Sequence, residues 1–267
     1  MIVDFHSHTL ESDGSLKPQA LADLMVERGV TVFSISDHDT LAAYGQFELP
    51  KHVRLVTGIE INTTYNANEV HILGYRLPLG DSTLVGILER NRAERRKRME
   101  RMVGALTASG YPITMAEVEA EADGGAVLGR PHVGKALIRK GLVGDIESAF
   151  RTLLRRGKPG YVPADHIGPH EAIEAIVAVG GVPVLAHPGR LHDYEIIDEL
   201  AEHGLRGLEV FYPSHEPAQV HHFREKAARH GLVMSGGSDF HDIRYNKRGV
   251  GMDVEPDDIA PFLELVS

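Results

Sequence analysis

The chain opens with the stretch IVDFHSH (residues 2–8), in which a short apolar segment ends in two histidines. Side chains alternate between the two sides of a β-strand, so His6 and His8 would point the same way. Two imidazoles at the end of an apolar strand are costly unless they have a partner. Imidazole is the commonest protein ligand of metal ions, so the pair indicates a metal site, although an H-x-H pattern alone is a weak signal.

The same arrangement, a polar side chain at the end of an apolar run, recurs along the chain. Further runs end close to His38, Glu60, His187, Asp239 and His241. In β/α barrels the carboxyl ends of the strands carry the active site, because the loops that follow them converge there. His71 is the exception, since it lies inside an apolar strand. We therefore expect these side chains to meet at one face of the fold.

Apolar runs with strand character alternate with helical patterns. We expect strands over residues 2–5, 30–36, 54–62, 69–75, 182–186, 207–211 and 232–235, and helices over 18–28, 82–109, 170–179, 194–203 and 216–230. Nearly continuous apolar strands that alternate with helices predict an α/β fold. Its sheet would be parallel and closed, or nearly closed, into a barrel.

The alternation stops between residues 82 and 163, where only helical patterns occur. After the long helix, we expect further helices over 114–121, 131–140 and 146–155. The sequence thus predicts a barrel domain built from residues 1–81 and 164–267, with an all-helical insertion at 82–163 as a cap.

Charge separates the two parts further. Residues 90–158 carry 15 Lys and Arg against 8 Asp and Glu, a net charge of +7, and the rest of the chain has a net charge of −17. A basic cap would attract an anionic substrate towards a metal site in the acidic body, and a solvated helical surface is the plainer alternative. The run RRKR at residues 95–98 is also consistent with nucleic-acid binding, but its charges cover every face of a helical turn.

Composition limits the other possibilities. With 267 residues, 42% of them hydrophobic, the chain is long enough for a sizeable soluble core. No apolar stretch is long enough to span a membrane and no secretory signal precedes the first strand, so we expect a cytoplasmic protein. The absence of cysteine excludes disulfides and thiolate ligands. Histidine and carboxylate ligands suit manganese, zinc or iron.

Nine side chains form the candidate ligand set: His6, His8, Asp13, His38, Glu60, His71, His187, Asp239 and His241. One metal with three or four protein ligands would use fewer than half of them, so the set predicts two or three divalent cations, with manganese the first choice. Glu60 is the expected bridging ligand, because a carboxylate offers one oxygen to each of two cations. Asp37 and Asp39 flank His38 and are expected to orient its ring, with a helix N-cap as the alternative role of Asp39.

These residues resemble the motifs of the polymerase-and-histidinol-phosphatase (PHP) superfamily. The matching motifs are His6-x-His8 with Asp13, Ser36-Asp37-His38-Asp39, Gly58-Ile59-Glu60, His71, Ala186-His187-Pro188 and Ser238-Asp239-x-His241. The resemblance implies a distorted (β/α)7 barrel with two or three metals that hydrolyses phosphoesters. It also implies that His6, His8, Glu60 and Asp239 bind one metal, and that the other five ligands serve the second and third.

The insertion narrows the resemblance. The stretches LGRPHV (128–133) and GYVP (160–163) are similar to those of the TrpH-like subgroup, whose members act on nucleoside 3′,5′-bisphosphates and on the 5′ ends of short RNA. This implies release of the 3′-phosphate to give a nucleoside 5′-monophosphate, with 5′–3′ trimming of short RNA as a further activity. A histidinol-phosphate or other small-molecule monophosphatase, and a polymerase-associated nucleic-acid-binding module, are the alternatives.

Substrate residues are expected in the cap and beside the metals. Arg130 opens a predicted helix, and its guanidinium would bind a phosphate with two donors. His132 and Ser7 would join it in binding substrate, and His187 or His241 would protonate the leaving oxygen. The expected partners are a phosphorylated nucleotide and short RNA, without duplex DNA or a membrane, and the oligomeric state stays open.

Overall fold

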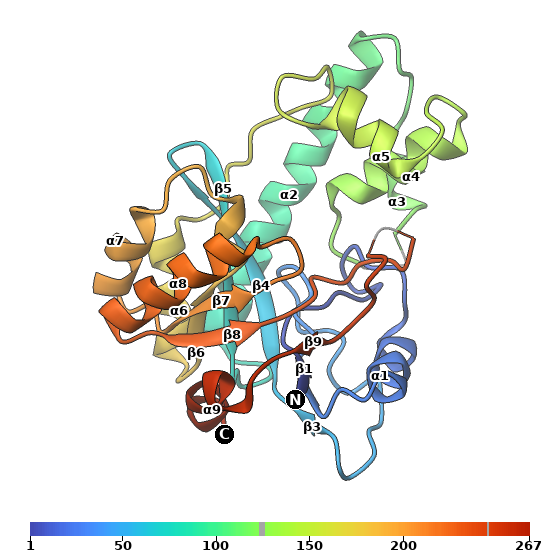
Figure 1. Ribbon diagram of the computed structural model, residues 1–267. Coiled ribbons are helices and arrows are strands. Elements are labelled where there is room, and N and C mark those ends of the chain that lie inside the picture. Colours follow the sequence, from blue (N-terminus) through green and yellow to red (C-terminus); the bar gives the residue numbers. More distant parts are fainter. Residues whose placement is uncertain (123–125, 245) are drawn as a thin grey trace.

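The computed structural model describes residues 1–122, 126–244 and 246–267, and it places the strands in two sheets (Figure 1). One sheet has the order β3-β2-β1-β9, from β1 (Ile2–Asp4), β2 (Val32–Phe33), β3 (Arg54–Leu55) and β9 (Met252–Asp253). The other has the order β4-β5-β6-β7-β8, from β4 (Gly58–Tyr65), β5 (Asn68–Tyr75), β6 (Val182–Leu185), β7 (Gly207–Phe211) and β8 (Val233–Gly236). The expected α/β class is confirmed.

Within the described residues, the sheets are not the parallel, closed barrel that the sequence suggested. β4 and β5 form an antiparallel hairpin, β5 is also antiparallel to β6, and β9 is antiparallel to β1. The hairpin is made by a two-residue turn at Asn66 and Ala67, whose φ values of +47° and +60° are left-handed. Such a turn reverses the chain directly, so no crossover helix separates β4 from β5.

Two short seams join the sheets edge to edge. At the first, the Phe5 N–H donates to the Gly236 carbonyl beyond β1, at 3.0 Å. At the second, the Asp39 N–H donates to the Glu60 carbonyl, also at 3.0 Å, which ties the loop after β2 to β4. The carboxyl ends of strands from both sheets are therefore held close together.

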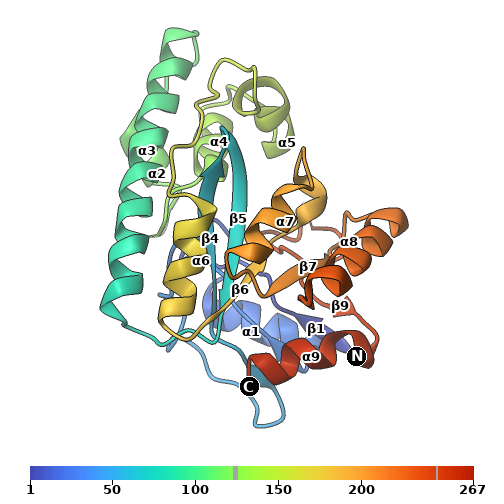
Figure 2. The same cartoon turned by 90° about the vertical axis from the view of Figure 1, so that its left-hand side faces the viewer.

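Helices cover the outer face of the five-stranded sheet (Figures 1 and 2). They are α6 (Pro169–Ala178), α7 (Ile196–Glu202) and α8 (Pro217–His230), which share a core with the outward side chains of β4 and β5. α1 (Pro18–Glu27) packs beside the other sheet. None of the described helices is both long and apolar enough to cross a membrane.

A second core fills the space between the sheets at the end away from the site. Phe5 contacts Phe262 and Tyr75 edge-on, with ring centroids 4.7 and 6.2 Å away. Phe262 belongs to α9 (Pro256–Leu265), which, like β9, the sequence analysis did not identify. β9 is two residues long, too short to show a period, and Pro261 inside α9 weakens its helical signal.

The segment after β5 forms the helical region (Figure 1). It contains α2 (Ser82–Ala108), α3 (Met115–Glu119), α4 (Arg130–Arg139), α5 (Ile146–Ala149) and the π-helix η1 (Phe150–Leu154), and no strand in the described part of 82–163. Asp81 caps α2 by accepting from the N–H groups of Thr83 and Leu84. Met102, Leu106 and Val133 belong to a core separate from those of the sheets.

Candidate metal centre

The structure brings all nine predicted ligands to the carboxyl ends of the parallel strands. His6 and His8 follow β1, His38 follows β2, and His187 follows β6. Asp239 and His241 follow β8, and Asp13 lies in the loop after β1. His71 reaches the same level from mid-strand because β5 runs antiparallel to its neighbours: Ile72 pairs with Leu185, the last residue of β6. The direction of β5 thus explains the position of His71. Glu60 does not follow a strand either: the predicted strand over 54–62 is divided into β3 and β4, and Glu60 is the third residue of β4.

Glu60 lies at the centre of the ligand set. Its Oε2 is 3.2 Å from His6 Nε2, 3.3 Å from His8 Nε2 and 3.0 Å from His38 Nδ1. Its Oε1 is 2.7 Å from His71 Nδ1 and 3.1 Å from His187 Nε2. The two oxygens therefore face two different groups of imidazoles, which is the geometry that a bridging carboxylate needs.

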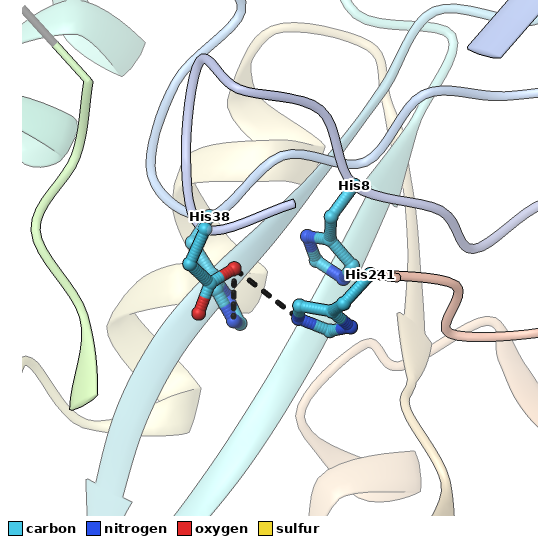
Figure 3. A group of neighbouring side chains, drawn as sticks. His8, His38 and His241 are labelled. Carbon is cyan, nitrogen blue, oxygen red and sulfur yellow. Dashed lines mark ion pairs between the residues drawn. The ribbon is translucent and has the colours of Figure 1, made fainter. Parts of the chain in front are cut away.

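Ligand atoms gather in three groups, in each of which the atoms lie within 4.8 Å of one another. The groups are His6, His8, Glu60 and Asp239; His8, Asp13, His38 and His241; and His38, Glu60 and His71. The first group has the four residues that the sequence resemblance assigns to one metal. Figure 3 shows His8, His38 and His241 of the second group pointing towards one another.

Several of these atoms are buried without a hydrogen-bond partner. They are His6 Nε2, both ring nitrogens of His8, Asp13 Oδ1 and Glu60 Oε2. Burying a polar atom without a hydrogen-bond partner costs free energy. Several such atoms in one cluster, all able to donate an electron pair, indicate that they bind a cation together. Imidazole nitrogens with carboxylate oxygens form a donor set that suits divalent transition metals. The residues present therefore fit metal cations.

The close contacts within the cluster shift the pKa values of its side chains. Burial alone would raise the pKa of Glu60, but the nearby imidazoles outweigh it and hold this pKa well below the usual range. The same balance lowers the pKa values of Asp13 and Asp239. Burial lowers the pKa of His38 to about 3 and that of His187 to about 4. The carboxylates are thus charged and these two imidazoles neutral, the forms in which each binds a metal. Burial opposes protonation of His6 and His8, but the surrounding carboxylates outweigh it: they raise the pKa of His6 well above its usual range and that of His8 to about 10, so a cation that binds these two rings would displace their protons.

Glu209 in β7 is a site residue that the sequence analysis missed. It is fully buried, His6 Nδ1 lies 3.0 Å from its Oε1, and the His187 N–H donates to its Oε2 at 2.7 Å. It therefore orients the ring of one ligand and the backbone of another, as carboxylates behind metal-bound imidazoles do. The available signal was a lone charge in the middle of the apolar strand GLEVF.

Asp37 and Asp39 do not contact the ring of His38, so both roles expected for them were wrong. Asp37 accepts from the Thr9 N–H and hydroxyl at 2.7 and 2.6 Å and from the Ser12 hydroxyl at 2.6 Å, and so holds the loop that leads to Asp13. Asp39 faces α2 instead, and no helix begins after it. His38 Nδ1 instead lies 3.0 Å from Glu60 Oε2 and 3.4 Å from Asn62 Nδ2.

A cavity of about 1390 Å³ lies over the ligands and extends beneath the helical region. Its basic lining includes Arg95, Arg98, Arg130, Lys135, Arg155 and Arg156 from that region. Arg130 Nη2 lies 2.8 Å from Glu69 Oε2, and Arg98 Nη2 lies 2.6 Å from Glu69 Oε1. One carboxylate from β5 thus pairs with two guanidiniums. These three side chains together carry a net charge of +1 where the helical region lines the cavity.

Arg190 and Tyr212, which the sequence analysis also missed, flank the metal cluster. The Tyr212 hydroxyl donates to Asp239 Oδ2 at 2.9 Å, and Arg190 Nη1 lies 3.1 Å from the same oxygen. The Arg190 guanidinium lies over the Tyr212 ring, 5.3 Å from its centroid. Arg190 belongs to the short helix η2 (Pro188–Arg190) and lines the cavity, so part of its donor fork faces the ligand space.

Two predicted substrate residues have other partners. Ser7 is fully buried, and its hydroxyl donates to the Ser34 carbonyl at 3.0 Å. His132 is also buried, and its Nδ1 accepts from the Gly129 N–H at 2.9 Å, which caps α4. Neither is among the cavity-lining residues, whereas Arg130 is. These positions assign Ser7 and His132 to the support of the site.

The chain is similar in sequence and in fold to proteins that are named as phosphate-ester-cleaving enzymes. No family model matches the sequence. The 3′,5′-nucleoside bisphosphate phosphatase of Chromobacterium violaceum is 32% identical over 269 residues, covering 97% of this chain and 93% of that protein. The 5′-3′ exoribonuclease Rnm of Escherichia coli is 33% identical, covering 90% and 85%. A solved structure from Bifidobacterium adolescentis, described as a metal-dependent phosphoesterase, matches with a TM-score of 0.86 at 30% identity and covers 98% and 96%.

Proposed function

Because the chain belongs to the PHP family of metal-dependent phosphoesterases, we propose that it hydrolyses nucleoside 3′,5′-bisphosphates, releasing the 3′-phosphate and leaving the nucleoside 5′-monophosphate. One observation carries this proposal: a single cavity joins the metal ligands to the arginines of the helical region. A substrate with two phosphates would place one at each end. We interpret the two sheets, joined at their seams, as an opened form of the family's distorted (β/α)7 barrel.

The metal ligands would hold two or three divalent cations, manganese first, with zinc or iron as alternatives. His6, His8, Glu60 and Asp239 would hold one, and the other groups would hold the rest. When bound, such cations polarise a phosphoryl oxygen and lower the pKa of a coordinated water towards about 7. Glu209 keeps the His6 ring aimed into the cluster through its hydrogen bond.

Arg190 and Arg130, which both line the cavity, would each bind a different phosphate of the substrate. Arg190, beside Asp239, would bind the phosphate that reacts and neutralise charge that develops on its oxygens. Arg130, with one Nη held by Glu69, would use its remaining donors for the distal phosphate. His241 lines the cavity with its side chain 25% exposed, so it is better placed than the buried His187 to give a proton to the leaving oxygen.

The test is a set of parallel assays with manganese-loaded protein. The substrates are a nucleoside 3′,5′-bisphosphate, the matching 3′-monophosphate, histidinol phosphate and a 5′-phosphorylated oligonucleotide. We expect the highest kcat/KM on the bisphosphate. Arg130→Met should lower the ratio of bisphosphate to monophosphate kcat/KM by about tenfold, the worth of one charge-assisted contact.

Arg190→Met is the matched comparison. It should lower kcat/KM on both nucleotides by about a hundredfold, the usual cost of removing a donor to the reacting group, and leave their ratio unchanged. Equal rates on the bisphosphate and histidinol phosphate would contradict the proposed substrate. Equal effects of the two arginine variants on the ratio would contradict the two-phosphate arrangement.

Trimming of short RNA from its 5′ end is a second candidate activity. The cavity volume of about 1390 Å³ exceeds the 300–1,000 Å³ of ordinary small-molecule pockets, and its lining continues to Arg155 and Arg156. These cations would contact phosphates beyond the first nucleotide. The oligonucleotide assay decides: an activity that falls steeply with added salt supports this candidate.

A further inference from the structure

The arginine-rich turn of α2 divides into an inner and an outer pair. Arg95 and Arg98 are buried, whereas Arg96 and Lys97 are exposed and pair with glutamates on the surface. The inner pair is held by carboxylates from outside the helical region: Arg95 by Asp39 and Arg98 by Glu69. On its inner side the turn therefore connects the helical region to Asp39 and Glu69.

Asp39 lies where three parts of the chain meet, one residue after the predicted ligand His38. Its Oδ2 accepts from Arg95 Nε at 2.8 Å, and its Oδ1 accepts from Asn91 Nδ2 at 2.9 Å and from the Asn62 N–H at 3.2 Å. The residue is fully buried and has a φ of +52°, a conformation that costs energy outside glycine and is retained where the surroundings fix it. The backbone beside His38 is therefore fixed by side chains of α2.

Arg95 also reaches the segment that precedes Arg130. Its Nη1 donates to the Leu128 carbonyl at 3.1 Å. The next residue, Gly129, lies so close to the ligand loop that an added Cβ would be 2.9 Å from Asp13 Oδ2. A continuous set of contacts therefore runs from His38 through Asp39 and Arg95 to the start of α4.

A guanidinium is suited to this position because its planar fork donates in two fixed directions at once. Nε serves Asp39 on one side and Nη1 serves Leu128 on the other. A lysine ammonium would keep the charge but could not reproduce both directions with one fixed geometry. The contacts thus require an arginine, and not merely a cation, at residue 95.

We propose that Arg95 is a positioning residue that couples the helical region to the metal ligands and sets the span between the metal site and Arg130. Through this span it would favour substrates whose two phosphates match the distance. The selectivity part rests on the proposed function, whereas the coupling does not. Arg95 acts through Asp39 and Leu128 and needs no contact with substrate.

The coupling is tested by hydrogen exchange of the amides of residues 128–130, 132 and 133, with and without saturating manganese. In the wild type, manganese should slow this exchange, because the cation fixes His38 and the contacts transmit the constraint. Arg95→Lys and Asp39→Asn should lose the slowing while still binding manganese. Arg96→Met, a change at the neighbouring exposed arginine, should retain it. Equal slowing in Arg95→Lys and wild type would overturn the proposal.

The selectivity is tested with the same proteins. Arg95→Lys should lower the ratio of bisphosphate to monophosphate kcat/KM by about tenfold or more, since a misplacement of about 1 Å can cost about a hundredfold in rate. An unchanged ratio would overturn the selectivity part. If the wild type itself has no preference for the bisphosphate, the proposed function fails, and the exchange experiment still decides whether Arg95 couples the two regions.

Discussion

The metal cluster and the helical region both depend on charge, but they are built in different ways. In the cluster, the nine predicted ligands lie close together, and Glu60 alone lies within 3.3 Å of five imidazoles. In the helical region, the buried Arg95 and Arg98 face carboxylates from outside that region, Asp39 in the loop after β2 and Glu69 in β5. The side chains of the cluster therefore contact one another directly, whereas the helical region is joined to the sheets through Asp39 and Glu69. Substitutions in the cluster should abolish chemistry, and substitutions at the cap contacts should change selectivity.

The largest effect is expected for Glu60→Gln. Glutamine preserves the shape, but it removes the charge shared by the surrounding imidazoles and one of the two equivalent oxygens. Metal content should fall, and kcat should drop by at least about a hundredfold to a thousandfold. Metal analysis of the purified protein and steady-state kinetics measure both. Glu89→Gln, on the exposed side of α2, is the matched control. Full metal content in Glu60→Gln would contradict the bridging role.

The same contrast explains what the sequence predicted well. Predicted ligands such as His6, His38 and His187 follow apolar strands, so local alternation was enough to predict that their side chains meet. The helices from Pro18 to His230 were also placed within two residues of their observed ends, when α5 and the π-helix η1 that follows it are taken together. Both results depend on patterns within a single segment. The hairpin at Asn66 was missed because its turn has no glycine, and the resulting direction of β5 could not be read locally.

The supporting residues were harder to predict because their partners are distant in the sequence. Glu209 contacts His6 across 203 positions, and Asp39 contacts Arg95 across 56. Nothing near Asp39 distinguishes a helix cap, a partner of His38 and a partner of Arg95. Contacts between distant elements decide such roles. The members of the cluster could therefore be predicted from local sequence, whereas the roles of Glu209 and Asp39 could be assigned only from the three-dimensional structure.

An intermediate effect is expected for Glu209→Gln. The amide keeps the volume and part of the hydrogen bonding to His6 and His187, but it lacks the charge that favours one orientation of the His6 ring. Changes behind a metal ligand typically cost about tenfold to a hundredfold in metal affinity. Manganese titration by calorimetry measures this. An unchanged manganese affinity accompanied only by a lower Tm would mean that Glu209 serves packing and not the metal ligands.

The smallest effect is expected for Glu69→Gln. This substitution tests the contact between β5 and the arginines of the helical region. Glu69 pairs with Arg98 and Arg130, and Glu69 and Arg130 are partly reached by solvent, with side-chain exposures of 24% and 29%. A partly exposed pair such as Glu69–Arg130 contributes about 0.5–1 kcal/mol, which corresponds to about twofold to fivefold. The buried Arg98 keeps its hydrogen bond to the Val162 carbonyl. If Glu69 holds Arg130 in place, KM for the bisphosphate rises by this factor while kcat and metal content stay the same. A lower KM would instead mean that Glu69 competes with the distal phosphate for Arg130. Glu69 would then hinder substrate binding, and it would not hold Arg130 in place for it.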